Sequence, residues 1–332
     1  MVKIYNQTLN QHEIKNKMIF LSNSVIKFRD DWQVPACTEK LSFYNHLFHR
    51  PDVIDQTYIA CPWATIIDHQ LVNNYNLEDN YISMMSNVIR SKNGKKHTVC
   101  QHIYWKKLID LWTTIGITDV HLSHYEKNVV NTDQIKFHSF ILTASNYENK
   151  DRSLGLSIKS NDNKKYLASF IGAHTKYYRN SIRLQLKNLF ATSNNILFEI
   201  NDEWFYQKIV YENQIKNMSI SAADFINHNS KTIRYNEILS DSIFSLCPEG
   251  SGPNTLRVWE SMSIGVIPVI FSDEWIPPSI PNLDWKDFYI FINQKDIPYT
   301  LDILKSISSK DIEIMKLNCL NAYKMFRQIT CF

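Results

Sequence analysis

The sequence predicts an α/β fold in which two halves each contain a parallel sheet. Strand–helix–strand patterns occur twice, in residues 98–122 and in residues 243–271, and such a pattern makes parallel strands with a right-handed crossover. A chain of 332 residues corresponds to about two domains. The polar stretch 146–165 lies between the two patterns and is the expected junction.

The N-terminal half contains a short strand at 98–100, a helix at 104–115 and a second strand at 120–122. Apolar residues recur at helical spacing within 104–115. Gly116 follows, at the place where a glycine commonly ends a helix. Residues 140–142 form a further candidate strand.

The C-terminal half begins with a strand at 166–171 that ends at Gly172, followed by a basic helix at 181–190. Its second pattern comprises strand 243–247, loop 248–254, helix 255–264 and strand 266–271. Apolar spacing in residues 300–326 predicts two amphipathic helices. We therefore predict an N-terminal domain at 1–150, a C-terminal domain at 151–298, and helices within 299–332 that pack back on the N-terminal domain.

The composition excludes several classes of protein. The formal net charge is only +3, which is too small for the basic surface of a nucleic-acid-binding protein. Hydrophobic residues make up 44% of the chain, so it is not a disordered polar chain. The N-terminal residues lack a signal-peptide pattern, and the apolar runs are far shorter than the ~20 residues of a membrane span. We expect a cytoplasmic protein, either free or peripheral at the inner face of the membrane.

The loop that follows residues 243–247 has the composition of an anion site. Glycine is scarce, with 7 residues in the chain, yet Gly250 and Gly252 both lie in this loop, with Ser251 between them. A glycine loop that opens a helix lets backbone N–H groups approach a phosphate, and the helix dipole favours the negative charge. Either Asn254 or Thr255 is placed to cap the helix.

Two charged residues follow in the first turns of this helix. Arg257 opposes the helix dipole, and a bound phosphate or pyrophosphate would explain its presence. Glu260 lies three residues later on roughly the same face, where a carboxylate can accept both hydroxyls of a ribose. The alternative is that the glycines only shape a turn and the two charges form a surface pair, because the loop is neither a dinucleotide fingerprint nor a P-loop.

A resemblance favours the nucleotide pocket. The segment 244–260, the run Gly265–Ile270, the pair Ser272–Asp273 and the segment Leu283–Trp285 closely resemble the exostosin-like glycosyltransferases. Upstream, Phe170–Gly172 with Arg183 fits the same family, and Cys100–His102 with Ser123–His124 is similar to its bacterial members. One departure is Glu249, where many relatives carry Arg or a small residue.

The resemblance implies the GT-B architecture, in which two Rossmann-like domains face a central cleft and the C-terminal one binds the donor. Arg257 would then bind the donor phosphates, Glu260 the ribose, and Arg183 a second phosphate. The backbone of Ser251 and Gly252 would lie near the pyrophosphate. The remaining donor-binding candidates are Gly172, Gly250, Asn254 and Thr255. The chain contains no Asp-x-Asp triplet, so we expect no metal and no cofactor.

Inverting sugar transfer needs a general base for the acceptor hydroxyl. His102 and His124 both follow predicted strands, where residues at the carboxyl ends of a parallel sheet gather; we expect both at the cleft and favour His124. Asp68 and Glu126 are the other candidates.

Two further groups of residues have a structural and a functional interpretation. The aromatic residues Trp63, Tyr104, Trp105 and Trp112 are more typical of a core than of a sugar platform. Residues 176–179 form a basic-aromatic patch that is either a solvated helix face or a contact with an anionic donor.

The sequence thus predicts an inverting, metal-independent glycosyltransferase. It would move a sugar from a nucleotide-sugar donor to a glycan or lipid-linked glycan, in the synthesis of a surface polysaccharide such as capsule or lipopolysaccharide. A sugar-nucleotide epimerase of similar architecture and a non-catalytic nucleotide-sugar-binding protein are the alternatives.

Overall fold

The computed structural model describes residues 18–20, 24–33, 38–49, 54–73, 76–279 and 282–331. The N-terminal residues on which the signal-peptide prediction rests lie outside these ranges. The chain divides into two compact units. Unit 1 comprises residues 1–140 and 328–332, and unit 2 comprises residues 141–327. The domain limits at 150 and 298 stay a prediction.

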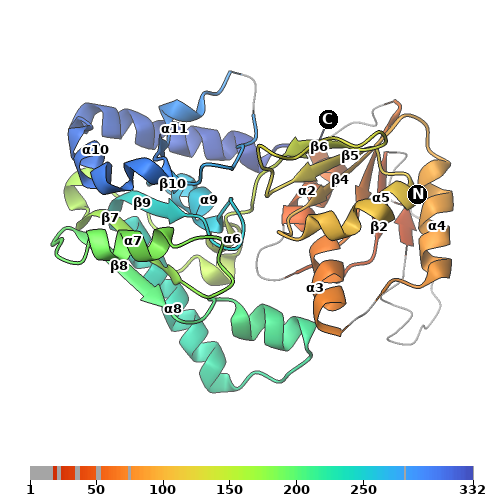
Figure 1. The fold of residues 1–332 in the computed structure, drawn as a ribbon, viewed down its shortest axis with the longest axis horizontal. Coiled ribbons are helices and arrows are strands. Elements are labelled where there is room, and N and C mark those ends of the chain that lie inside the picture. The colour runs from red at the N-terminus through yellow and green to blue at the C-terminus, as the bar shows by residue number, and fades with distance from the viewer. Residues whose placement is uncertain are drawn as a thin grey trace. The chain divides into compact units, whose positions relative to one another are not determined.

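Unit 1 is built on a six-stranded sheet whose strands follow one another in chain order (Figure 1). All neighbouring strands pair in parallel except the first two. The strands are β1 (Met18–Phe20), β2 (Val25–Phe28), β3 (Gln56–Ala60), β4 (Lys95–Cys100), β5 (Asp119–Leu122) and β6 (Lys136–Ser139). The helices are α2 (Thr38–His49), α3 (Trp63–Asn73), α4 (Asp79–Arg90) and α5 (Ile109–Ile115).

The predicted strand–helix–strand pattern of this unit is confirmed as β4, α5 and β5. Its helix begins with a 3₁₀ turn over Trp105–Leu108 and ends at Gly116, whose φ of 88° lies in the left-handed region. The predicted strand at 140–142 is wrong, since the strand is β6, which ends at Ser139. Phe140, Ile141 and Leu142 are buried. An apolar run predicts burial, but it does not show whether the backbone pairs with a neighbouring strand.

Tryptophans fill the core of unit 1. Trp63 and Trp112 are fully buried and meet edge to face at 5.9 Å, and Trp105 is buried in the same cluster. The Trp63 indole donates to the Thr98 hydroxyl at 2.7 Å, so its polar atom is satisfied. The core interpretation of these three residues is confirmed, whereas the Tyr104 side chain is 47% exposed.

A row of histidines crosses the sheet of unit 1. His97 on β4, His121 on β5 and His138 on β6 lie on neighbouring strands; His97 Nδ1 is 3.2 Å from His121 Nε2, and His121 stacks on His138 at 4.6 Å. His138 pairs with Asp119 at 2.9 Å. Burial lowers the pKa of His97 to about 4 and lowers the pKa of His121 strongly.

We expect unit 1 to lose stability as the pH falls from 7.5 to 5. His97 is neutral in the native state and has a pKa of about 6.5 when unfolded, so protonation favours unfolding throughout this window. The loss from His97 alone is about 2 kcal/mol at pH 5. Lys95 and His138 add repulsion to a protonated His97, and Asp119 opposes it. Because the pKa of Asp119 is lowered, its own contribution is lost only at more acidic pH.

Urea unfolding at the two pH values, followed by tryptophan fluorescence, checks this expectation. The variant His97→Gln removes the titrating group. The difference in unfolding free energy between the two pH values is therefore expected to be smaller in this variant by about 2 kcal/mol. An unfolding free energy that is the same at pH 5 and pH 7.5 would contradict the prediction.

Unit 2 is built on a five-stranded parallel sheet of order β11-β10-β9-β7-β8 (Figure 1). The strands are β7 (Tyr166–Ala173), β8 (Ile196–Asn201), β9 (Ser242–Pro248), β10 (Ile267–Phe271) and β11 (Ile290–Phe291). The chain runs from β7 outward to β8 and then returns to the other side of β7 to form β9. The strand order therefore reverses between β7 and β9, where open α/β sheets bind ligands beyond the carboxyl ends of the strands.

The α-helices of the described part of unit 2 are α6 (Ser145–Glu148), α7 (Ile182–Leu189), α8 (Ala222–Ser240), α9 (Leu256–Ser263), α10 (Thr300–Ser306) and α11 (Ser309–Arg327). The predicted helices at 181–190 and 255–264 are confirmed as α7 and α9, whereas α6, α8 and a π-helical segment at Gln207–Ile215 were not predicted. The two predicted C-terminal helices are confirmed as α10 and α11, and α11 packs along α9. The predicted α/β class, with a parallel sheet in each half, is confirmed.

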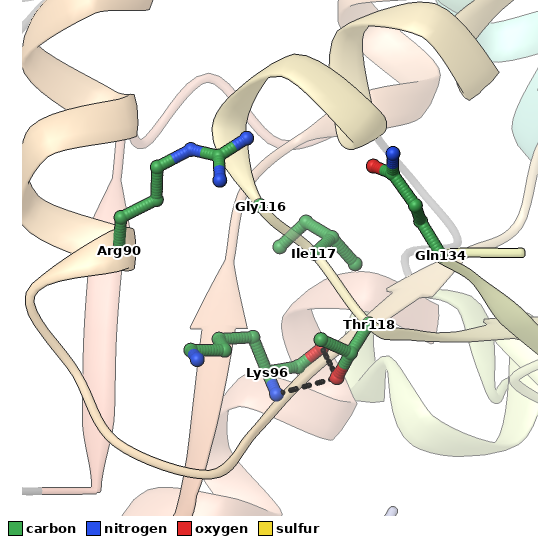
Figure 2. A pocket seen from close by; sticks show the side chains of 6 residues that line it. All are labelled: Arg90, Lys96, Gly116, Ile117, Thr118 and Gln134. Atoms are coloured by element: carbon green, nitrogen blue, oxygen red, sulfur yellow. Dashed lines mark hydrogen bonds between the residues drawn. The ribbon is translucent and has the colours of Figure 1, made fainter.

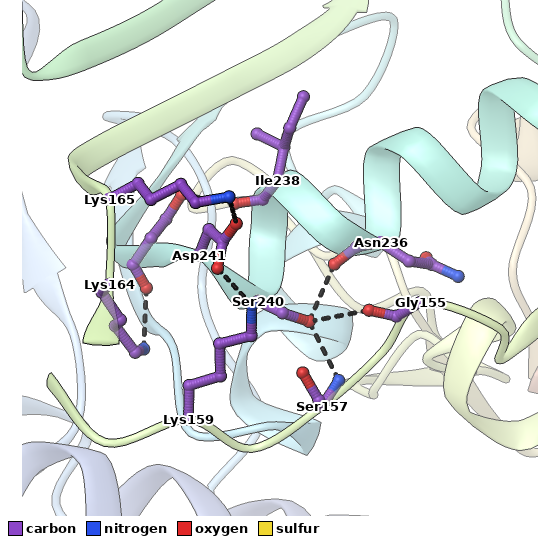
Figure 3. A network of polar contacts seen from close by, with 10 residues as sticks. Gly155, Ser157, Lys159, Lys164, Lys165, Asn236, Ile238, Ser240 and Asp241 are labelled. Carbon is purple, nitrogen blue, oxygen red and sulfur yellow. Dashed lines mark hydrogen bonds and ion pairs between the residues drawn. The ribbon is translucent and has the colours of Figure 1, made fainter.

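A polar network anchors the segment that leads into β7. Asp241, which follows α8, accepts from Lys159 and pairs with Lys165 at 3.1 Å. The Ser240 hydroxyl contacts the carbonyl of Gly155 at 3.2 Å. Figure 3 shows these side chains converging on the end of α8. The network ties residues 155–165 to the start of β9, so this polar stretch is a structured part of unit 2.

Within the described residues, no helix combines the length and the apolar character that a bilayer crossing requires.

Candidate active site

The candidate site of unit 2 lies at the carboxyl ends of β7 and β9, where the strand order reverses. Gly172 is near the end of β7, and Gly250 follows the end of β9. The loop 249–255 then leads into α9, so the N-terminal end of this helix lies at the same edge. The fold thus brings the glycine loop to the edge where open α/β sheets bind ligands, and the anion site itself stays a prediction.

Arg257 connects the first turn of α9 to the end of β7. It lies in the first turn of α9, and its guanidinium donates to the carbonyl of Ile171 on β7. The same group lies 4.4 Å from the centroid of Phe170 and 5.1 Å from that of Tyr235. One hydrogen bond and two aromatic faces orient the guanidinium and leave donors for an anion, since arginine carries five N–H groups.

Close approach explains the glycine at position 172. A Cβ built there would lie 2.7 Å from a ring carbon of Phe170 and 3.1 Å from Arg257 Nη2. A side chain at this position would therefore displace the Phe170 ring and press on the guanidinium of Arg257.

Glu260 is held one turn further along α9. Its carboxylate is buried and accepts from the Tyr235 hydroxyl at 2.7 Å and from the Asn146 amide at 3.4 Å. Burial raises the pKa of Glu260, and Arg257 and Arg152 oppose that rise. Tyr235 thus contacts both residues that are predicted to bind the donor, because its ring lies against the Arg257 guanidinium and its hydroxyl donates to Glu260. Ribose binding by Glu260 stays a prediction.

Arg183 connects the ends of β7 and β9. Its guanidinium is buried and donates to the carbonyls of Ala173, Pro248 and Glu249. It also lies 5.1 Å from the centroid of Phe170, the ring that Arg257 contacts from another side. Burial lowers the pKa of Arg183 to about 10. The three carbonyl bonds give this residue a positioning role, and its predicted contact with phosphate stays a prediction.

The helix cap is Thr255. Its hydroxyl accepts from the Arg257 backbone amide at 3.4 Å, whereas Oδ1 of the Asn254 side chain accepts from the Trp259 indole at 3.1 Å. The loop itself is closed by a bond from the Gly250 amide to the Gly252 carbonyl at 3.2 Å. The end of the loop is thus held by the hydrogen bonds of Asn254 and Thr255 to α9, and its start by the bond between Gly250 and Gly252.

Glu249, the departure from the family pattern, has protein partners. Its carboxylate accepts from Asn180 and from Ser272, and Arg179 of the basic-aromatic patch lies 3.9 Å away. Burial raises its pKa, and Arg179 is the largest opposing influence. These contacts account for an acid at this position.

The sequence argument missed a buried polar group beside Glu260. Arg152 donates to the Asn146 side chain at 3.0 Å and lies 2.8 Å from His228 Nε2. Asn236 accepts from Asn146 at 2.8 Å and donates to the Arg152 carbonyl at 2.7 Å. Asn146 and Arg152 belong to the stretch that composition marked as a junction. Only tertiary contacts distinguish them from solvated polar residues.

The carboxyl edge of unit 1 gathers several of the candidate bases. His102, just after β4, lies 3.1 Å from Asp68 in α3. Asp68 also accepts from Gln33, which follows β2. His124 is buried just after β5. Their roles in catalysis stay predictions.

A pocket of about 350 Å³ opens at the opposite edge of this sheet, lined by Arg90, Lys96, Gly116, Ile117, Thr118 and Gln134 (Figure 2). It lies beside the amino ends of β4, β5 and β6, away from the edge where parallel sheets bind ligands. Arg90 donates there to the carbonyls of Thr113 and Thr114 at the end of α5. The positive charge of Arg90 therefore has a structural role, because it stabilises the C-terminal end of α5.

Comparison with known proteins gives a family. Residues 68–307, more than half of the chain, match the Exostosin GT47 domain. Probable beta-1,4-xylosyltransferase IRX10L of Arabidopsis thaliana is 40% identical over 73 residues, which cover 22% of this chain and 18% of that protein. Exostosin-1 of Drosophila melanogaster is 28% identical over 160 residues, which cover 47% of this chain and 20% of that protein. Of the solved structures, the crystal structure of TarM aligns with a TM-score of 0.36 and 12% identity over 86% of this chain and 54% of that one.

The matched segments span about a fifth of the length of these two relatives. The segment 244–260, from which the resemblance started, lies within the matched range. The chain belongs to the Exostosin GT47 family of glycosyltransferases, as the motif between β9 and α9 predicts.

Proposed function

We propose that this chain is an inverting, metal-independent glycosyltransferase that uses a nucleoside diphosphate sugar. The acceptor would be a hydroxyl of a glycan or lipid-linked glycan in the synthesis of a surface polysaccharide. One observation carries the proposal. Arg257, in the first turn of α9, donates to Ile171 at the end of β7 and shares the Phe170 ring with a second arginine, Arg183.

Two guanidinium groups on one ring repel each other, and each lowers the cost of placing an anion beside them. A diphosphate at this edge would accept from Arg257 and face the α9 N-terminus. In the transfer reaction the same groups would stabilise the charge that develops on the leaving diphosphate. The base would come from the carboxyl edge of unit 1, where Asp68, His102 and His124 lie.

Thermal unfolding with UDP, GDP, CDP, ADP and dTDP tests the donor site. One diphosphate is expected to raise the Tm, since a ligand at 100 times its Kd stabilises the native state by about 2.7 kcal/mol. The shift is expected to persist in EDTA, and the corresponding nucleoside without phosphates is expected to give none. The absence of a shift with every diphosphate would contradict the proposed site, and a shift lost in EDTA would contradict metal independence.

Turnover with the matching nucleotide sugars then tests the reaction. Release of the diphosphate is expected to depend on an added glycoside acceptor, and the product is expected to have the anomeric configuration opposite to that of the donor, as read by NMR. Formation of a new donor epimer without any acceptor would instead identify an epimerase.

A further inference from the structure

A hydrogen-bonded group of side chains occupies the carboxyl edge of the unit 1 sheet. Asp68 Oδ1 lies 3.1 Å from His102 Nε2, and Asp68 Oδ2 accepts from the Gln33 amide. Gln101, at the end of β4, donates to Gln33 at 3.1 Å. Asp68 is therefore held from two sides by residues that follow β2 and β4.

The hydrogen bonds determine which nitrogen of His102 carries the proton. The backbone N–H of Tyr104 donates to His102 Nδ1 at 3.0 Å. A backbone amide only donates, so Nδ1 is the acceptor and the proton of the neutral ring is on Nε2, facing Asp68. Both ring nitrogens of His102 are thus engaged. The Asp68 carboxylate keeps further lone pairs, because it accepts one bond at each oxygen.

A second carboxyl group, that of Glu39, is buried behind this edge. Glu39 is fully buried and accepts from the amides of Ala64 and Gln101 at 3.2 and 3.1 Å. Burial raises the pKa of Glu39 to about 8, and the charge of Asp68 adds to this rise. A buried carboxyl that stays protonated near neutral pH is not a base for the acceptor hydroxyl, so Glu39 is not the candidate.

The same edge has two features of a binding site. Arg29, directly after β2, has a φ of 62°, a strained conformation that is more common at functional sites than elsewhere. Tyr104 exposes its ring beside His102, with 5.6 Å between the two ring centroids. An exposed aromatic face next to a carboxylate suits a sugar ring whose hydroxyl is to be deprotonated.

We propose that Asp68 is the general base of the transfer and that His102 is its positioning residue. Asp68 would take the proton of the acceptor hydroxyl while that oxygen forms a bond to C1 of the donor sugar. The bond from C1 to the phosphate oxygen breaks, and the nucleoside diphosphate leaves with the electron pair. The proposal rests on the proposed function and gives Asp68 the role that the sequence argument favoured for His124.

Kinetics of the full chain test the assignment. Asp68→Asn is expected to lower kcat by at least about 100-fold and to leave the affinity for the nucleoside diphosphate unchanged. In Asp68→Ala, formate is expected to restore part of the rate by replacing the missing carboxylate. His102→Gln still offers an amide to Asp68, so its loss is expected to be about 10-fold, with the acid limb of the pH profile retained. Asp110→Asn, on the exposed face of the same unit, is the matched control.

The outcomes separate this proposal from the proposed function. A wild-type chain that transfers while Asp68→Asn stays within about threefold of it contradicts only the assignment. Loss of the acid limb in His102→Gln or in His124→Gln would make that histidine the base and overturn the proposal. A wild-type chain that transfers no sugar, although it binds a diphosphate, contradicts both.

A measurement independent of turnover tests the geometry. Nitrogen-15 NMR of histidine-labelled protein, with the His102 signals assigned from His102→Gln, is expected to show a protonated Nε2 and an unprotonated Nδ1. The Nε2 signal is expected to shift in Asp68→Asn. A ring protonated at Nδ1 would leave Nε2 as a free base and overturn the proposal.

Discussion

Replacing Arg257 by alanine is expected to lower kcat/KM for sugar transfer by about 100- to 1,000-fold. The guanidinium is held on Phe170 and on the Ile171 carbonyl, so it would meet the proposed diphosphate without further ordering. Its charge would matter most as the leaving phosphate gains negative charge. Calorimetric titration with the diphosphate that stabilises the wild type is expected to show much weaker binding in the variant.

Two further variants make the Arg257 result specific. Arg257→Lys keeps the charge and loses the planar fork, so we expect partial activity. Arg234→Ala removes an exposed arginine of the same unit that pairs with Glu199, and we expect near-normal binding. If Arg257→Ala bound the diphosphate as the wild type does, the candidate donor site would be wrong.

Replacing Trp259 by alanine is expected to lower the free energy of unfolding of unit 2 by about 3–5 kcal/mol. Trp259 is fully buried in α9 and meets Trp275, Trp285 and Phe326 at 6.5, 5.9 and 5.2 Å. Truncation would leave a cavity that these rigid rings fill poorly. Urea unfolding followed by circular dichroism measures the loss.

The same residue links the core to the donor loop. Because the Trp259 indole donates to Asn254, Trp259→Phe is expected to retain most of the stability and to weaken diphosphate binding through a looser loop. Trp204→Ala is the control, since Trp204 is 41% exposed and its loss is expected to be small. Equal destabilisation by Trp204→Ala and Trp259→Ala would contradict this account of the core.

Local sequence patterns predicted the ends of helices well, because the conformation of one residue or the spacing of a few decides where a helix begins or ends. Gly116 ends α5 in the left-handed region, and Thr255 caps α9, as short-range rules require. The strand expected at 140–142 was wrong because its apolar residues are buried outside the sheet. Burial alone carries no information on which backbone groups pair.

Long-range contacts could not be predicted in the same way. The sequence marked Arg183 as a charged candidate, but only the fold shows that its donors meet the carbonyls at the ends of β7 and β9. Tyr235 lies 25 residues before Glu260 in the chain and is its hydrogen-bond partner. Asn146 and Arg152 look like solvated residues until α8 and α9 pack over them.

The sequence by itself determined the family and the α/β class, because these depend on short segments with their own conformational rules, and it named the loop that we propose as the donor site. The tertiary structure alone decided that this loop lies where the strand order reverses, and that Asp68 meets His102 and Gln33. Strand order and side-chain pairing arise from contacts between distant segments. No single segment contains that information.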